Sequence, residues 1–182
     1  MLDRCEKMKK ALISMLLVLA LAFSFCACAG KKEVVKTYQS SADFAELGLA
    51  LEAPEGAQNQ TYSVVKSSHN GEELDIAQIL YEYDGISCEL RTANIGSYNV
   101  SGFDESKASS EEAYDLNVGD YSSQIRVMRV NSMYVAIWFL GEHSYSLSAK
   151  TDDSLTVTSC AIDAANANVP AAAQVTTEAV SE

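Results

Sequence analysis

Met133-Tyr-Val-Ala-Ile-Trp-Phe-Leu140 is the stretch that decides the fold, because apolar side chains occupy both sides of an extended chain. Alternate residues of a β-strand point to opposite faces of a sheet, so this stretch predicts a central strand covered on each face. Tight-turn residues flank it, namely Asn131-Ser132 before and Gly141-Glu142 after. The neighbouring runs at about 123–130 and 143–149 are therefore expected to pair with it as antiparallel strands.

The same turn chemistry continues toward the N-terminus. Asp84-Gly85 separates two runs, 74–83 and 86–92, and in the second of them apolar and polar residues alternate. An Asp-Gly pair between such runs favours a β-hairpin. Two further strands and a long Ser-, Gly- and acid-rich loop are expected at 61–67, 112–118 and 94–110.

Helices are expected at both ends of the domain. Ser41-Ala-Asp-Phe-Ala-Glu-Leu47 is typical of a short helix that Gly48 would end, and 152–164 begins with acids suited to a first helical turn. We therefore predict an α+β fold. It is a single domain with a mainly antiparallel meander sheet, a short N-terminal helix and a C-terminal helix packed on the sheet.

The first residues predict export. Basic residues precede an uncharged apolar run that ends in Phe25-Cys-Ala-Cys28, which is the pattern of a secretory signal. This ending is similar to the lipobox of bacterial lipoproteins, in which the thiol of the last cysteine accepts a diacylglyceryl group. Cys28 is the expected lipid attachment site. The run could also be an uncleaved membrane helix, or be cut near Ala29. All three readings place the domain outside the cytoplasm, and the first places it on the outer face of the cytoplasmic membrane.

Four segments follow from this pattern. We expect a lipoprotein signal peptide at 1–27, a polar tether at 28–39 and an α+β extracytoplasmic domain at 40–165. A disordered tail is expected at 166–182, because this stretch has no aromatic residue and no periodic pattern.

The charge balance excludes one class of partner. The chain has a formal net charge of −12, and removal of residues 1–27 leaves nine basic against 23 acidic residues, a net charge of −14. Such a charge repels phosphate backbones, so no nucleic-acid partner is expected. It also disfavours adsorption to anionic lipid, so we expect the lipid anchor alone to hold the protein at the membrane.

Two cysteines, Cys88 and Cys160, remain in the predicted domain. Export permits a disulfide between them. Cys88 alternates with Ile86 and Leu90, however, which places it on a core face where a free thiol acts as a small apolar side chain. The sequence leaves both readings open.

The order of these patterns resembles a known family. The features are a helix ending at Ala45-Glu-Leu-Gly-Leu49, an extended segment with Pro54, hairpins, the strand with Trp138, and Asp152-Asp-Ser-Leu155 opening a last helix. This order is similar to domain of unknown function 4367, which occurs outside the membrane in Gram-positive lipoproteins and anti-sigma-like membrane proteins. The resemblance implies an antiparallel sheet with flanking helices and carries over no catalytic residue.

Residue types that could carry chemistry are scattered along the chain. His69 and His143 have no other ligand at zinc spacing, and no hydrolase serine motif is present. The acidic pairs lack the spacing of a calcium loop, which leaves weak calcium binding between Asp104 and Asp115 as a minor alternative. The acidic pairs are Asp104-Glu105, Glu111-Glu112 and Asp152-Asp153. We expect no metal site and no cofactor.

Tyrosines are the remaining candidates for binding. Exposed tyrosines in a row could grip sugar or peptide, although half-buried sheet tyrosines are the preferred reading. The residues concerned are Tyr81, Tyr83, Tyr98, Phe103, Tyr114 and Tyr121. We therefore predict a non-enzymatic binding module that recognises protein, peptide or wall polymer. The alternatives are a carrier of a hydrophobic ligand between sheet and helix and a surface hydrolase, which would need the histidines and acids to meet.

Overall fold

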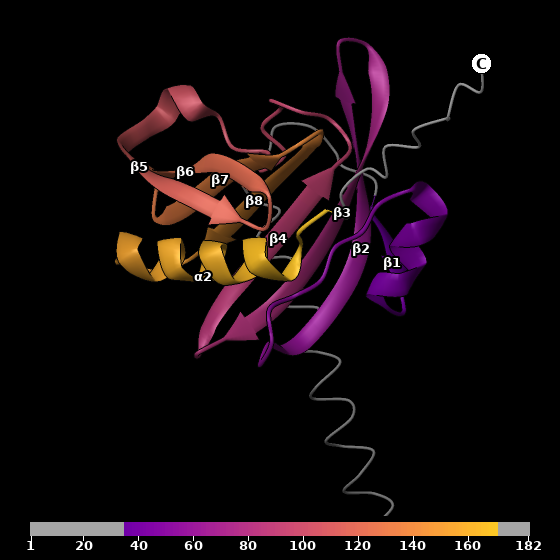
Figure 1. The fold of residues 1–182 in the computed structure, drawn as a ribbon, viewed down its shortest axis with the longest axis horizontal. Coiled ribbons are helices and arrows are strands. Elements are labelled where there is room, and N and C mark those ends of the chain that lie inside the picture. The colour runs from indigo at the N-terminus through magenta and orange to yellow at the C-terminus, as the bar shows by residue number, and fades with distance from the viewer. Residues whose placement is uncertain (1–34, 171–182) are drawn as a thin grey trace, which may run out of the picture.

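The computed structural model describes residues 35–170, which form one eight-stranded antiparallel sheet with a C-terminal helix (Figure 1). The strands are β1 (Val35–Tyr38), β2 (Gln58–His69), β3 (Glu72–Tyr83), β4 (Ile86–Ala93), β5 (Ala108–Val118), β6 (Tyr121–Val130), β7 (Met133–Leu140) and β8 (His143–Ala149). The helical elements are the 3-10 helices η1 (Ser41–Leu47) and η2 (Glu105–Lys107) and the α-helix α2 (Ser154–Ala167).

The sheet consists of two four-stranded meanders that meet at a seam between β4 and β8. The strand order is β1-β2-β3-β4-β8-β7-β6-β5. After β4 the chain crosses to the far edge of the sheet, starts again at β5, and returns strand by strand until Thr92 faces Tyr145 across the seam. The expected meander is therefore interrupted once, by the crossing at residues 94–107.

The central-strand prediction for Met133–Leu140 is confirmed. β7 lies between β6 and β8, and its residues Val135 to Trp138 are all buried. Even-numbered residues such as Trp138 pack with α2, whereas Val135 and Ile137 belong to a separate apolar cluster with Phe103. The two sheet faces thus have different covers. We call the side under α2 and η1 the helix face, and the side under residues 94–107 the loop face.

The helix face holds the main core. The Trp138 and Tyr145 rings stack with centroids 5.5 Å apart and an interplanar angle of 7°. Helix α2 contributes mostly small buried side chains, including Ala161 and Ala164, which let the helix approach the sheet closely. Asp153 caps the helix by accepting hydrogen bonds from two backbone amides of its first turn.

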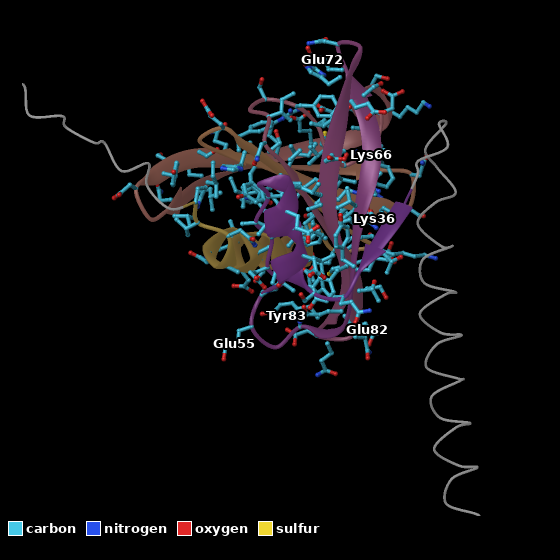
Figure 2. The ribbon with its side chains drawn as sticks, turned by 90° about the vertical axis from the view of Figure 1, so that its right-hand side faces the viewer. Lys36, Glu55, Lys66, Glu72, Glu82 and Tyr83 are labelled. Carbon is cyan, nitrogen blue, oxygen red and sulfur yellow. The ribbon has the colours of Figure 1, made fainter. Side chains whose placement is uncertain are left out.

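The ordered fold extends past the expected boundaries at both ends. β1 lies within the segment 28–39 that was expected to be a tether, because it pairs with β2 at the edge of the sheet, where Figure 2 labels Lys36 and Lys66 on the two strands. Tyr38 also packs against Phe44, with ring centroids 5.9 Å apart. Helix α2 continues to Ala167, beyond the expected limit of 165, and Asn168 is buried. The helical segment 41–47 is a 3-10 helix that ends at Gly48, whose φ of 66° suits glycine.

Several expectations lie outside the described residues. They are the signal peptide at 1–27, the lipid site Cys28, the first part of the tether and the tail from residue 171 onward.

Candidate interaction site on the loop face

A buried charged pair stands at the centre of the loop face. Glu89 and Arg91 follow one another on the same side of β4, and their side chains are only 5% and 9% exposed. Arg91 Nε lies 3.0 Å from Glu89 Oε1 and donates a hydrogen bond of 2.9 Å to Gln78 Oε1. Gln78 in turn donates to Ser63 Oγ at 3.1 Å. A polar network therefore crosses β2, β3 and β4 inside the protein.

The same arginine holds the crossing loop onto the sheet. Arg91 Nη1 donates to the carbonyl oxygens of Ser101 and Val100, at 3.2 and 3.4 Å. A buried guanidinium is costly unless its N–H groups find acceptors. The loop carbonyls supply such acceptors, so the charge of Arg91 and the position of the loop depend on each other.

Three further contacts fix the beginning of the loop. The ring of Tyr98 lies 4.5 Å from that of His69 at the tip of the β2–β3 hairpin. Ser144 Oγ, at the start of β8, accepts a hydrogen bond from the Tyr98 amide at 3.3 Å and donates to the carbonyl of Ile95. The first half of the loop is thereby attached to both meanders.

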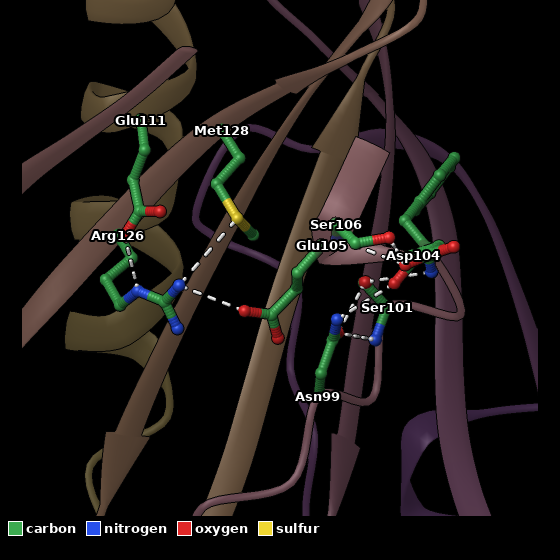
Figure 3. Close-up of polar contacts among 9 residues, drawn as sticks. Asn99, Ser101, Asp104, Glu105, Ser106, Glu111, Arg126 and Met128 are labelled. Atoms are coloured by element: carbon green, nitrogen blue, oxygen red, sulfur yellow. Dashed lines mark hydrogen bonds and ion pairs between the residues drawn. The ribbon is translucent and has the colours of Figure 1, made fainter. Parts of the chain in front are cut away.

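The middle of the loop is shaped by its own side chains (Figure 3). Asn99 Oδ1 accepts from the amide and the hydroxyl of Ser101, at 2.9 and 2.5 Å. Asn99 Nδ2 donates to the carbonyl of Phe103 at 3.0 Å. These short-range bonds form a compact turn of the kind that Asn and Ser side chains favour.

Arg126 fixes the end of the loop, as Figure 3 shows. It donates to Glu105 Oε2 at 2.9 Å and to Glu111 Oε1 at 2.8 Å, so η2 and β5 are both tied to β6. The guanidinium also lowers the pKa of the Glu111 carboxyl below its usual value. Glu105 and Glu111 belong to acidic pairs for which the sequence predicted no binding site.

We call residues 94–107 the pinned loop. It has no regular structure before η2, yet contacts to β2, β4, β6 and β8 hold it. Its exposed residues are Asn94, Gly96, Ser97, Gly102, Asp104, Ser106 and Lys107. A loop held by a rigid sheet is a common site of recognition, so this surface is the candidate interaction site.

Within residues 35–170, neither histidine forms a hydrogen bond or ion pair with an acidic side chain. His69 packs on Tyr98 and its Nε2 lies 3.0 Å from Asn70 Nδ2, whereas His143 lies beside Tyr145 with ring centroids 6.3 Å apart. Among residues 35–170 no group of three or more His, Cys, Asp or Glu residues could hold a metal ion. The arrangement required for the hydrolase alternative is not formed by these two histidines.

The acidic pairs serve local structure. Asp104 accepts from the amide and hydroxyl of Ser106 at the start of η2, which lowers the pKa of its carboxyl. Asp115, its suggested partner in calcium binding, accepts instead from Gln124 at 3.3 Å. Asp153 caps α2, and the hydroxyl of Thr156 in that turn lowers the pKa of its carboxyl.

The tyrosines pack against the core, as the preferred reading predicted. Tyr81 is 3% exposed, and burial raises the pKa of its phenol. Tyr83, Tyr114 and Tyr121 are half-buried against the helix-face core. Tyr83 also donates to Asp163 of α2 at 3.1 Å. These rings are structural members of the sheet.

The space between sheet and α2 is occupied by side chains. Trp138, Leu147, Val157 and Ala161 are all fully buried there. A hydrophobic ligand held between the two layers would have to displace them, so the geometry gives the carrier alternative no support.

Sequence reasoning missed Glu89 and Arg91. Their alternation with Cys88 and Leu90 indicated a solvated face, whereas both are buried. The available signal was an acid and a base two positions apart on one strand, beside a loop of unusual length. It becomes informative only once the loop is known to cross that face.

Comparisons with known proteins assign no family to this chain. Models of protein families, curated proteins and solved structures each gave no match to the chain. Within residues 35–170, none of the helices has both the length and the apolar character needed to cross a bilayer.

Proposed function

We propose that this protein is an exported lipoprotein, held on the outer face of the cytoplasmic membrane by acyl chains on Cys28. Its domain acts as a non-enzymatic interaction module that recognises a protein, peptide or wall polymer through the pinned loop. The observation that carries the recognition step is the attachment of an irregular loop to the sheet through the buried Arg91. The proposal includes a relationship between this domain and domain of unknown function 4367.

The anchor rests on the leader sequence. A basic start, an apolar run and Phe25-Cys-Ala-Cys28 together fit lipoprotein processing. The chain after Cys28 is strongly acidic, so its surface would be repelled by anionic lipid. A covalent lipid therefore supplies the membrane affinity that the protein surface lacks.

The interaction role rests on the pinned loop. Its fixed shape means that little conformational entropy is lost when a partner binds. Exposed Ser97, Asp104 and Ser106 offer hydrogen-bonding groups, while Tyr98 and Phe103 are half-buried beneath them. Such a surface suits a polar partner better than an apolar one.

The anchor is tested by Cys28→Ala in the full chain. We expect the variant to lose incorporation of a labelled fatty acid and to leave the membrane fraction, because the acceptor thiol is gone. Cys26→Ala is the matched control and should keep both label and location. Unchanged membrane retention of the Cys28 variant would instead indicate an uncleaved helix.

The interaction surface is tested by site-specific photo-crosslinking on intact cells. A crosslinking residue is placed at Ser97 or Ser106 of the pinned loop, and at Ser159 on the exposed side of α2 as the control. We expect a defined adduct from the two loop positions and none from Ser159. Equal labelling at all three positions, or adducts at Ser159 alone, would contradict the proposed surface.

A further inference from the structure

The two cysteines of the domain are buried in the same core cluster on the helix face. Cys88 lies on β4 and Cys160 on α2, and both belong to the same core cluster, at 1% and 4% exposure. Both thiols are free in the structure, and the Cys88 thiol donates a hydrogen bond of 3.7 Å to the carbonyl oxygen of Ile86. These are the only thiols left in the chain once residues 1–27 are removed and Cys28 is acylated.

Neighbouring contacts hold α2 over this point of the sheet. Tyr83, at the end of β3, donates to Asp163 of α2 at 3.1 Å, one turn of helix beyond Cys160. Tyr81 and Ala149 flank Cys88 on the adjacent strands. A disulfide forms without strain only when two cysteines are already close, and the bond between Tyr83 and Asp163 holds the part of α2 that carries Cys160 over this part of the sheet.

We propose that Cys88 and Cys160 form a disulfide that joins α2 to β4 once the chain is outside the cytoplasm. The timing rests on the proposed export, because oxidising compartments allow disulfides to persist. The pairing itself rests on the burial of both side chains in one core cluster, beside the hydrogen bond between Tyr83 and Asp163.

The oxidation requires a disulfide donor, either a small-molecule disulfide or an oxidised thiol–disulfide protein. The Cys160 thiolate attacks one sulfur of the donor and expels a thiolate, which leaves a mixed disulfide. Cys88 then loses its proton and attacks the Cys160 sulfur, and the second donor thiolate leaves. The two protein thiols give up two protons and two electrons, and the donor is reduced to two thiols.

The order of attack follows from the exposure and the acidity of the two thiols. The neighbouring thiol lowers the pKa of Cys160, whereas the same neighbour and burial raise the pKa of Cys88. Cys160 is also the more exposed of the two. It is therefore the thiol that meets the donor first.

Tryptic mapping of the full chain from cells reports the bond directly. Cells are quenched in acid, free thiols are alkylated, and the protein is digested without reduction. No Lys or Arg lies within 67–90 or 151–182, so Cys88 is carried by peptide 67–91 and Cys160 by peptide 151–182. We expect these two peptides to be linked, and to separate on reduction. Alkylation of both cysteines in membrane-anchored protein would overturn the proposal.

A second arm separates this outcome from a failure of export. Purified, reduced full chain is treated with glutathione disulfide, which requires no export. If the 67–91 and 151–182 peptides become linked there while the cellular protein is reduced and cytoplasmic, the pairing stands and the proposed export fails. If only glutathione adducts form, the pairing is overturned, whatever the location of the protein.

Thermal unfolding gives an independent readout. Reductant should lower the Tm of the oxidised chain by about 10 °C, because the cross-link restricts the unfolded state. Cys88→Ala and Cys160→Ala variants, which keep small apolar side chains in the core, should show no response to reductant. The Cys26→Ala variant should respond like the parent chain. A Tm that ignores reductant in the parent chain would overturn the proposal.

Discussion

The two faces of the sheet are held by different forces. On the helix face, Trp138, Tyr145 and the small side chains of α2 bury apolar surface, and the hydrophobic effect is the main stabilising term. On the loop face, Glu89, Arg91 and Gln78 are also buried, but hydrogen bonds and an ion pair connect them. Figure 1 shows α2 in front of the sheet, with the β2–β3 hairpin projecting beyond it.

This difference assigns separate tasks to the faces. Apolar packing is tolerant of direction and gives the domain its stability, whereas a buried polar network is specific in geometry and fixes one arrangement of the loop. We therefore expect substitutions on the helix face to change mainly global stability. Substitutions on the loop face should change the order of residues 94–107 as well.

The largest expected effect is on the helix face. Trp138→Ala removes a fully buried ring that stacks on Tyr145, and such truncations cost about 4 kcal/mol of unfolding free energy. Denaturant-induced unfolding measures this loss. Leu155→Ala, at a position of α2 that is 64% exposed, is the control and should cost less than about 0.5 kcal/mol. A similar loss in both variants would mean that the helix face is not the main core.

The next effect is on the loop face. Arg91→Met removes the guanidinium from Glu89 and from the loop carbonyls, and we expect a loss of about 3 kcal/mol. Hydrogen exchange of the amides of 98–103 should also accelerate, which Trp138→Ala should not do selectively. The double variant Glu89→Leu with Arg91→Met should recover part of the stability but not the slow exchange. Unchanged exchange in Arg91→Met would show that the loop is held without the arginine.

A smaller effect tests whether the helix face also needs polar contacts. Asn168 exchanges hydrogen bonds with the backbone of Glu52 at 2.7 and 2.8 Å, which ties the end of α2 to the segment before β2. Asn168→Ala should cost about 2 kcal/mol in denaturant unfolding. Asn166→Ala removes one exposed bond within α2 and should have little effect. Equal losses would indicate a general effect on helix stability.

The smallest effect concerns pH. Arg126 lowers the pKa of Glu111 in the folded protein, so this contribution is present above the carboxyl's unfolded pKa and is lost as the pH falls through the folded value. Glu111→Gln should therefore reduce the loss of stability on acidification below about pH 4.5. Both side chains are partly exposed, so the difference should stay below about 1 kcal/mol and shrink with salt. If the unfolding free energy of Glu111→Gln and that of the parent chain depend on pH in the same way, this ion pair does not contribute to stability.

Much of the sheet could be predicted from turn residues and alternation. Met133–Leu140 and His143–Ala149 match the expected strands at both ends, because Gly141 and Asn131 mark their limits. The short edge strand β1 was missed because Lys36-Thr-Tyr38 has no clear apolar alternation and depends on pairing with β2. Edge strands of this kind are recognised by their partners rather than by their own residues.

The loop face could not be predicted, because its physics is non-local. Ser144, Ser146 and Ser148 alternate with apolar residues on β8 and indicate a solvated side, yet all three are buried. Ser144, at the N-terminal end of β8, is buried by the loop that crosses from β4 to β5, because it contacts Ile95 and Tyr98 of that loop. That crossing follows from the strand order, which pairs β4 with β8 instead of β5. No single segment of the sequence encodes that choice.

The seam between β4 and β8 also bears on how the chain reaches its native state. Apart from β1, which is joined to β2 through residues 39–57, each meander consists of consecutive hairpins with short-range contacts. Thr92, by contrast, must find Tyr145 from 53 positions away. Local contacts form early and distant ones late, so the two halves should become ordered before they join. Residues 94–107 are the main-chain link between these halves. A protease cut within them would leave two fragments that reassemble along the β4–β8 pair and through the contacts of α2 with Tyr83 and Glu52.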